Sequence, residues 1–476
     1  MTRTQRATAS GFCLSAMLWA GVAGSQPLTV ERAVQIALEK NTQMVGALAS
    51  EIDARGGLYG AYSAVLPQLS ASLSRGSSKT TGQTGTQLFG TFAVPSPLTD
   101  NTGYSTTPSI AGSWSVLNLS ALKQVSSARS ALKASQFGMQ AARSTVALQT
   151  RQQFYNVVSA YHLAGVADVA LKLARDNERR VRALFEVGSV SRSDLLSARV
   201  QTANSQLDSL TANQNVVNQR IALAQALAMR ETELGDVDTL LTVEPQEFDE
   251  PSLLVEASKS RPDLKAAEAQ LNSGRLGLTA ARLARLPYVS VSGSAQFDLR
   301  SSFTQQRFGV FPADSFDFAD GSGIVHRFPP RTPSVVDPKT SGRSQSDRVL
   351  RGEIALNWDI FDGFSTDSRI ASARARLLRA EENRDALRRN LEAEVHQALL
   401  QYRQAIERQS VANSAYDSAR ENLKLTQQKY NVGSTTILDL NTAQVNLTRA
   451  AADQISALAS IRIAEAQLYR VRGQAE

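Results

Sequence analysis

One pattern occurs twice in this chain, and the repeat limits the possible folds more than any other feature. A Val-Gly-Ser turn stands at residues 187–189 and again at 432–434, each time after a long helical run. Gly433 follows Gly188 by 245 residues, and Asp439 follows Asp194 by the same interval. Glycine ends the first helix and lets the chain reverse. The sequence therefore predicts a helix–turn–helix unit that is used twice.

The helical runs before the two turns are too long for an ordinary globular core. Residues 120–186 and 365–430 contain no proline. At a rise of 1.5 Å per residue, each helix would be roughly 100 Å long. Helices of this length must pack lengthwise against other helices. A return helix is expected after each turn, over residues 191–230 in the first case, and residues 28–66 are expected to form one further helix.

Between the helices, the hydrophobic period changes to two residues, which is typical of strands. Leu-Pro pairs at 66–67 and 286–287 end the preceding helices, because proline cannot continue the hydrogen-bond ladder. Alternation predicts strands at 68–75, 109–117, 288–297 and 350–360. Residues 76–108 and 299–348 lack a period and are expected to be exposed loops, and the sequence assigns no role to the second.

The strands indicate a membrane protein. Segments of about ten residues with one apolar and one polar face are typical of outer-membrane strands, although a soluble sheet packed on a core is the alternative. A spanning sheet must close, since open edges are not tolerated in lipid. Bacterial barrels begin at about eight strands, so copies of the chain must share one barrel. The helices that adjoin the strands would continue that barrel as a tube.

The N-terminus and the charge pattern fit export rather than nucleic-acid binding. Residues 1–25 combine a basic start with a short apolar run, as in a signal peptide, with a buried N-terminal helix as the alternative. Cys13, the single cysteine, lies inside that run and lacks a lipid-attachment context.

The formal charge of +7 comes from basic residues that alternate with acidic ones, which indicates solvated helix faces rather than a nucleic-acid-binding stripe. After the signal, no apolar stretch is expected to reach the roughly 18 residues of a membrane helix.

Four parts of the sequence resemble the TolC-type outer-membrane efflux and secretion channels. They are the opening Leu-Thr-Val-Glu-Arg-Ala at 28–33, the Leu-Pro entries, a tryptophan near the end of each second strand, and residues 430–439. The resemblance implies a mixed fold, with a trimeric twelve-stranded membrane β-barrel continuous with a twelve-helix α-barrel tunnel. The repeated features of the sequence itself indicate four strands per protomer and an internal two-fold repeat, at 26–230 and 257–476, joined by a connector at 231–256.

The same resemblance implies a function. The protein would be the exit duct of a tripartite efflux or type I secretion system in the outer membrane of a Gram-negative bacterium, with its tunnel in the periplasm. It would conduct passively, as a homotrimer, and dock on a periplasmic adaptor and an inner-membrane transporter. The alternatives are a periplasmic adaptor and a trimeric surface fibre. The transported substrate is not predicted.

Candidate site residues follow from the same comparison. The predicted gate residues are Asp439, Asp194 and Tyr430, for which helix capping and seam packing are the alternative roles. The predicted adaptor-docking tips are Val187, Gly188, Ser189, Val432, Gly433 and Ser434. The predicted strand–helix joints are Pro67 and Pro287, and Trp114 and Trp358 are expected at the membrane interface or in packing alone.

The chain departs from the family pattern at two gate positions. Thr435 stands where a gate arginine is expected, and Thr442 stands where a second aspartate is expected. The closed-state lock is therefore expected to be built differently. The sequence shows no catalytic motif, and its histidines (His162, His326 and His396) lack ligand spacing. No enzymatic activity, metal or cofactor is predicted.

Overall fold

The computed structural model describes residues 27–83, 86–89, 92–95, 98–242, 246–307, 316–319, 321–328 and 340–473. The predicted signal peptide lies outside these residues. Contacts divide the chain into two compact units. The first contains Met1–Gly56, Arg129–Gly274 and Arg376–Glu476, and the second contains Gly57–Ala128 and Arg275–Ala375. The chain passes from one unit to the other within four helices.

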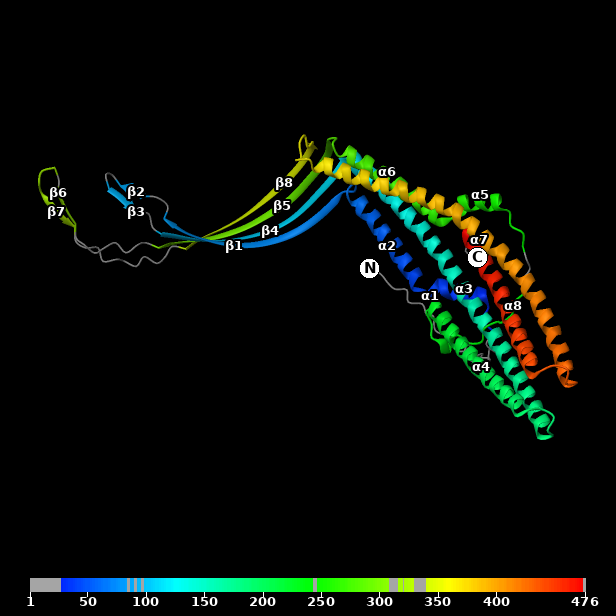
Figure 1. Cartoon of the computed structure of the whole chain (residues 1–476). Helices are drawn as coiled ribbons and strands as arrows, with labels where there is room; N and C mark the ends of the chain where they lie inside the picture. Colours follow the sequence, from blue (N-terminus) through cyan, green and yellow to red (C-terminus); the bar gives the residue numbers. More distant parts are fainter. Residues whose placement is uncertain are drawn as a thin grey trace, which may run out of the picture. The chain divides into compact units, whose positions relative to one another are not determined.

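Long helices dominate the described chain (Figure 1). They are α1 (Val30–Lys40), α2 (Thr42–Ser63), α3 (Leu119–Glu186), α4 (Arg192–Ala226), α5 (Glu250–Ser260), α6 (Pro262–Leu283), α7 (Ser365–Asn431) and α8 (Ile437–Val471), with a short 3₁₀ helix at Glu231–Glu233. The two long helices that the sequence predicts are present as α3 and α7, since nothing in either run interrupts the ladder.

The single helix predicted over 28–66 is broken at Asn41. The backbone of Asn41 is extended, at φ −63° and ψ 137°. Its side-chain oxygen accepts from the Gln43 N–H at 2.8 Å, and its amide nitrogen donates to the Ala226 carbonyl at 2.8 Å. Asparagine competes with the backbone for hydrogen bonds in this way. The chain therefore ends α1 there and begins α2 in a new direction.

The first unit contains two similar hydrophobic cores. In one, Val157 and Leu223 are fully buried between α3 and α4. In the other, Tyr402 and Leu468 are buried between α7 and α8. Tyr402 follows Val157, and Leu468 follows Leu223, by the same 245 residues that separate the two turns. Equivalent positions of the two halves thus do equivalent packing.

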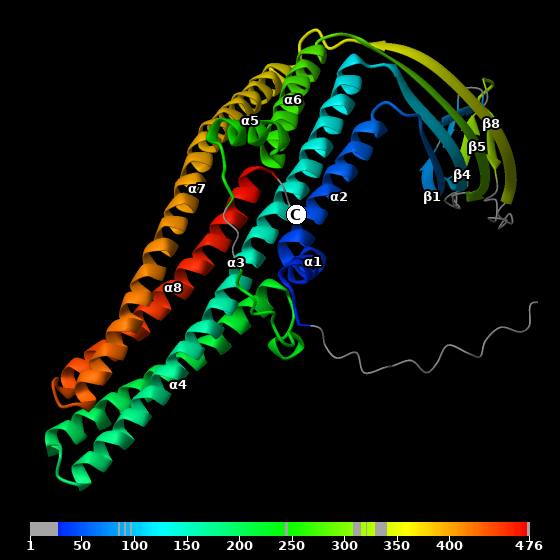
Figure 2. The same cartoon turned by 90° about the vertical axis from the view of Figure 1, so that its right-hand side faces the viewer.

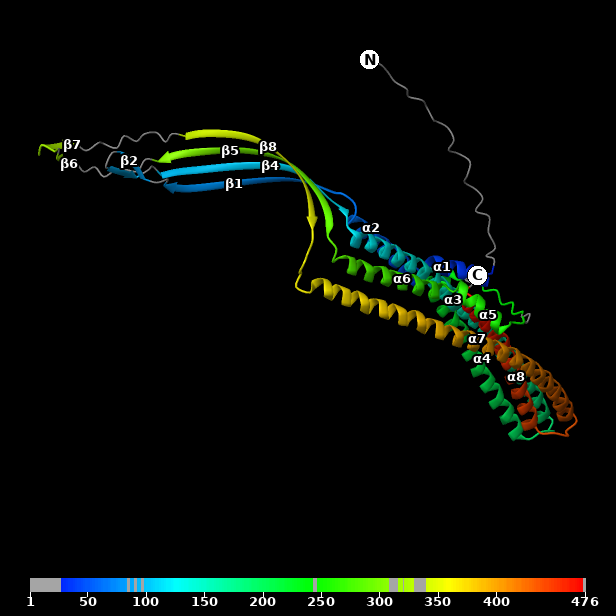
Figure 3. The ribbon, with the colours of Figure 1, turned by 90° about the horizontal axis from the view of Figure 1, so that it is seen from above.

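The second unit contains an antiparallel sheet in the order β1-β4-β5-β8 (Figures 1 and 3). Its strands are β1 (Gln68–Gln83), β4 (Leu98–Leu117), β5 (Tyr288–Arg307) and β8 (Thr340–Asn357). Two short hairpins are formed by β2 (Thr86–Phe89) with β3 (Phe92–Pro95), and by β6 (Phe316–Ala319) with β7 (Val325–Phe328).

The strands run further than predicted, into both segments that were expected to be loops. The added parts are rich in serine, threonine and glycine and lack a regular alternation of apolar and polar residues. Residues Ser74–Gln83 of β1 nevertheless pair continuously with Leu98–Thr107 of β4. The backbone ladder of the neighbouring strand, rather than side-chain alternation, holds them in strand form. The last predicted strand instead ends early, at Asn357.

Trp114 and Trp358 each stabilise a joint between a helix and a strand. The Trp114 indole N–H donates to the Val65 carbonyl at 2.9 Å, and the Trp358 indole N–H donates to the Arg285 carbonyl at 3.2 Å. Each acceptor lies two residues before the proline of its joint. Both indoles are also exposed. A tryptophan at this place can hold the turn with its N–H while its ring faces the surroundings.

One described helix differs from the expectation about membrane helices. α3 contains a window of 18 residues with a mean hydropathy of 1.3, long and apolar enough by composition to cross a membrane. The expectation that no such stretch follows the signal is therefore wrong. Helices packed in protein cores pass the same test, and 39% of this window is already buried within the chain.

Candidate channel entrance at the hairpin tips

The two Val-Gly-Ser turns have the same backbone geometry. Gly188 and Gly433 take left-handed φ values of 76° and 75°. In the first turn, the Ser189 N–H donates to the Leu184 carbonyl at 2.8 Å. In the second, the Ser434 N–H makes the corresponding bond to Lys429 at 2.9 Å. These are Schellman caps, which need a residue that tolerates positive φ, so glycine is required for the turn itself.

A capping box begins the return helix after each turn. The Asp194 carboxylate accepts from the Ser191 N–H at 3.0 Å, and the Ser191 hydroxyl accepts from the Asp194 N–H at 3.1 Å. The Thr436 and Asp439 pair repeats this arrangement at 3.0 and 3.2 Å. Both candidate gate aspartates therefore stabilise the start of a helix, whatever further role they have.

The second box holds one additional bond. The Asp439 carboxylate accepts from the hydroxyls of Thr436 and Thr435, each at 2.7 Å. The hydrogen bonds from Thr436 and Thr435, together with the Thr436 N–H, hold the pKa of Asp439 below its usual value. Thr435 thus supports the carboxylate from the place where the family pattern would put an arginine. The other departure, Thr442, donates back to the Leu438 carbonyl within α8.

The two hairpin ends pack on each other, as Figure 2 shows for the α3/α4 and α7/α8 tips. Val181 of α3 and Leu195 of α4 form one hydrophobic cluster with Leu423, Ile437 and Leu440 of the other hairpin. Val181 and Leu440 are fully buried. The turn residues themselves project out of this cluster, since Val187 is 74% exposed and Val432 is 79% exposed.

Tyr430 packs at the edge of this cluster and buries its side-chain hydroxyl. The hydroxyl is buried and has no hydrogen-bond partner among the described residues. Burial, and then the nearby charge of Asp194, raise the pKa of Tyr430, while Arg180 acts in the opposite sense. Arg180 is itself within reach of Gln427, whose side-chain oxygen, in the amide orientation its surroundings favour, accepts at 2.6 Å.

The structure therefore brings the three predicted gate residues to one end of the helical unit. Asp194 and Tyr430 interact electrostatically across the two hairpins, and Asp439 caps the adjacent helix. Capping and packing, which the sequence left open as alternatives, are both observed. A pore constriction needs copies of the chain that the structure does not contain, so that role stays a prediction, as does adaptor docking by the tips.

The sequence did not predict an apolar groove that lies beside the tips. It encloses about 500 Å³ between α4 and α8, and its apolar walls are the exposed side chains of Leu196, Val200, Leu438 and Val445. Leu196 and Val200 lie four residues apart, and Leu438 and Val445 lie seven residues apart, so each pair shares one face of its helix. This spacing, on two return helices that each also bury a second stripe, could have indicated the groove.

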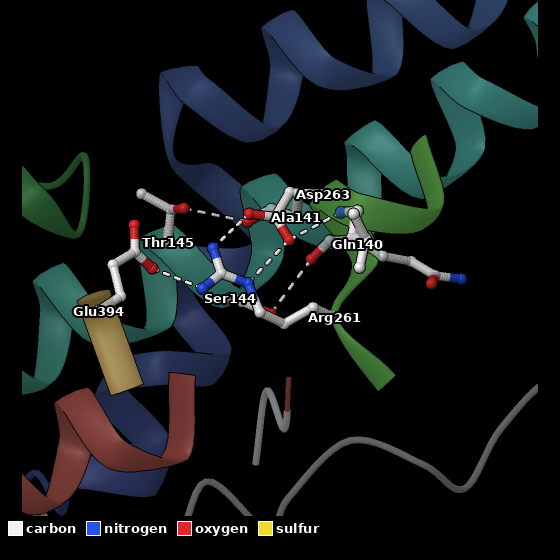
Figure 4. Close-up of polar contacts among 8 residues, drawn as sticks. Gln140, Ala141, Ser144, Thr145, Arg261, Asp263 and Glu394 are labelled. Carbon is white, nitrogen blue, oxygen red and sulfur yellow. Dashed lines mark hydrogen bonds and ion pairs between the residues drawn. The ribbon is translucent and has the colours of Figure 1, made fainter. Parts of the chain in front are cut away.

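A buried arginine forms a second polar centre that the sequence did not suggest (Figure 4). Arg261, whose side chain is 8% exposed, bonds Asp263 at the start of α6, with Nε 2.9 Å from Oδ1, and also bonds Glu394 of α7. Burial alone would lower the pKa of Arg261, but the bonds to Asp263 and Glu394 outweigh it and raise that pKa. The centre is satisfied within the chain and joins α6 to α7.

A protein family model and several solved structures match this chain. A family model described as "Outer membrane efflux protein" matches residues 33–229 and 253–474. The Campylobacter jejuni CmeC outer membrane channel is 18% identical, with a TM-score of 0.72 over 93% of this chain and 85% of that chain. The Vibrio cholerae outer membrane protein VceC is 15% identical, with a TM-score of 0.70 over 94% and 96%.

The open-state MtrE outer membrane channel of Neisseria gonorrhoeae is 18% identical, with a TM-score of 0.66 over 94% of this chain and 89% of that chain. At such identities, the structural matches establish the fold alone. A comparison with curated proteins returned no match.

Proposed function

Because this chain belongs to the outer membrane efflux protein family, whose model matches most of its length, we propose that it is the exit duct of a tripartite efflux or type I secretion system. Membership makes it an outer-membrane efflux channel protein. We further propose that it forms a trimer, that its hairpin tips carry a gate, and that it works with a periplasmic adaptor and an inner-membrane transporter. The observation that carries this proposal is a four-stranded sheet whose two edge strands, β1 and β8, have no further partner strand among the described residues.

The sheet argues for a shared barrel. Its strands are 16 to 20 residues long, more than enough to cross a bilayer, and one face carries exposed Leu69, Leu73, Ile354 and Leu356. Unpaired edges are intolerable in lipid, and four strands are too few to close. Three copies would pair β1 of each protomer with β8 of the next and close a barrel of about twelve strands.

The order of the elements supports an internal duplication. α2, β1, β4, α3 and α4 of the first half are followed by α6, β5, β8, α7 and α8 in the second. Each protomer then supplies two hairpins to a helical tube. The exposed valines of the tips are suited to contact with a periplasmic adaptor. The protein itself acts as a conduit rather than an enzyme, and the inner-membrane transporter supplies the energy.

The gate proposal centres on Asp439. Three hydrogen-bond donors stabilise its charged form, so the carboxylate stays ionised at neutral pH. In a trimer, three copies would form a ring of negative charge at the entrance and attract cations. Asp194 and Tyr430 would meet at the contact between the hairpins, which must separate when the entrance widens.

The gate is tested by conductance in planar bilayers. Asp439→Ala is expected to reduce cation selectivity and block by divalent cations, because the ring loses its charge. Thr436→Ala is the matched control, since it breaks the same capping box and keeps the carboxylate. Identical traces from wild type and Asp439→Ala would refute the charged ring, and an equal change in both variants would assign the effect to helix capping.

The duct itself is tested by fractionation. The proposal expects a heat-modifiable trimer in the outer membrane that crosslinks to an adaptor through cysteines placed at Val187 or Val432. Recovery in the soluble periplasm would favour the alternative of a periplasmic adaptor. A surface-exposed trimer that crosslinks to no periplasmic protein would favour a structural fibre.

A further inference from the structure

The apolar face of the sheet carries an arginine directly beyond its apolar band on both edge strands. Residues two apart on a strand share a face. On β1, Leu69, Ala71 and Leu73 are therefore followed on the same face by Arg75. On β8, which runs the other way, Leu350 is adjoined on this face by Arg348. Both arginines are exposed.

The strand register shows that the two arginines lie at nearly the same level of the sheet. Arg75 stands opposite Thr106, which in turn stands opposite Leu299. Arg348 stands opposite Phe297, one same-face position from Leu299. The Arg348 guanidinium lies 5.3 Å from the centre of the Phe297 ring. A cation over an aromatic ring at the end of an apolar band is typical of the boundary between lipid tails and headgroups.

The other face of the same strands provides a contrast. It is lined by polar residues, among them Asp298, which accepts hydrogen bonds from Thr107 at 3.0 Å and Gln296 at 2.9 Å. Arg343 and Arg351 lie on this polar face, at odd positions of β8. Arginines are thus present on both faces, but those on the apolar face adjoin the apolar band on one side. Lys79, also on the apolar face, has Asp100 as an ion-pair partner at 4.0 Å.

The edge position of the two arginines gives them a common ligand. The inference rests on the proposed trimer, in which β1 of one protomer lies beside β8 of the next. Arg75 and Arg348 of neighbouring protomers then lie on the two strands that meet at one seam, and both add positive charge to it. Guanidinium groups bind phosphate oxygens in a bidentate fashion. We propose that each seam binds the phosphate group of an anionic lipid in the outer leaflet of the membrane.

The test compares two charge-matched double variants of the intact trimer. Native mass spectrometry in detergent would measure the binding of bis-phosphorylated lipid A and of its dephosphorylated form. Arg75→Gln/Arg348→Gln is expected to weaken binding of the phosphorylated lipid by about tenfold or more, since each basic residue near an anionic lipid surface contributes. Arg343→Gln/Arg351→Gln removes the same charge from the polar face and is expected to change it less than about twofold. Arg75→Lys/Arg348→Lys retains part of the binding.

Each result has a defined meaning. Equal losses in the two Gln variants, or equal binding of the two lipid forms, would overturn the lipid site. Complete displacement of the lipid by millimolar inorganic phosphate would overturn it in favour of a simple anion site. Heat-modifiable migration of every variant shows that the trimer is intact. If the wild type is not a trimer, the proposed function fails; if the trimer forms and both variants bind alike, the lipid inference alone fails.

Discussion

The two hairpin tips have the same backbone and different side chains. Both use a glycine at positive φ and a capping box. At equivalent positions, Phe185 of the first tip becomes Tyr430 in the second, and Val190 becomes Thr435. The second tip thereby gains a buried hydroxyl that has no hydrogen-bond partner in the described part of the chain, and an extra bond to its aspartate. The shared glycine and capping box form the hairpin turn. A gate function can therefore lie in the side chains that differ between the tips.

The largest expected effect tests the shared part. Gly188→Ala and Gly433→Ala should each destabilise their tip by about 1–2 kcal/mol, since an L-residue is strained at positive φ. Apart from the adjoining residues, no atom in the described part of the chain lies within 4 Å of the added Cβ at either position, so strain alone is measured. Hydrogen exchange of peptides spanning each tip would report it. Clearly unequal losses at the two tips would show that their backbones are not equivalent in the assembled protein.

The shared part was also the part that the sequence could predict. Helix length and the glycine stops depend on local rules that a few neighbouring residues express. The break at Asn41 depends on a bond to Ala226, and the centre at Arg261 depends on Glu394, 133 residues away. No local pattern encodes such partners. The ends of the strands could not be predicted for a related reason, because their polar residues are held in place by hydrogen bonds to the neighbouring strand.

The next prediction tests the hydroxyl that distinguishes the second tip. Tyr430→Phe gives this tip the side chain of the first and removes a buried hydroxyl for which the described residues offer no partner. It should stabilise the isolated tip by about 1 kcal/mol, measured by hydrogen exchange. The reverse change, Phe185→Tyr, should have little effect, because Phe185 is partly exposed and a new hydroxyl can reach water.

The same variant separates packing from gating. If the Tyr430 hydroxyl finds a partner in a closed trimer, Tyr430→Phe should instead destabilise the closed entrance and increase the basal conductance in bilayers. A stabilised tip with unchanged conductance would assign Tyr430 to packing. The two readouts therefore decide between the two roles that the sequence left open.

A smaller effect is expected at the helix caps. Ser191→Ala removes the side-chain half of the first box and should cost the start of α4 about 0.5 kcal/mol, near the low end for N-caps because the site is exposed. Thr436→Ala should cost the start of α8 less, since Thr435 still holds the Asp439 carboxylate. Thr435→Val/Thr436→Ala should restore the larger loss. Equal exchange rates in the single and double variants would show that the Thr435 contact adds nothing.

The smallest effect is a pH dependence confined to the second tip. The pKa of Asp439 is lowered in the folded protein, chiefly by the hydroxyls of Thr436 and Thr435. Such a group contributes stability above its unfolded pKa, about 3.9, and loses that contribution as the pH falls through the lower folded value. Protection of the α8 start should thus exceed that of Asp439→Asn at pH 6, and the difference should shrink progressively as the pH falls below about 4. A difference that instead grows on acidification would mean that repulsion within a ring of carboxylates, which raises their pKa, outweighs these hydrogen bonds in the assembled channel.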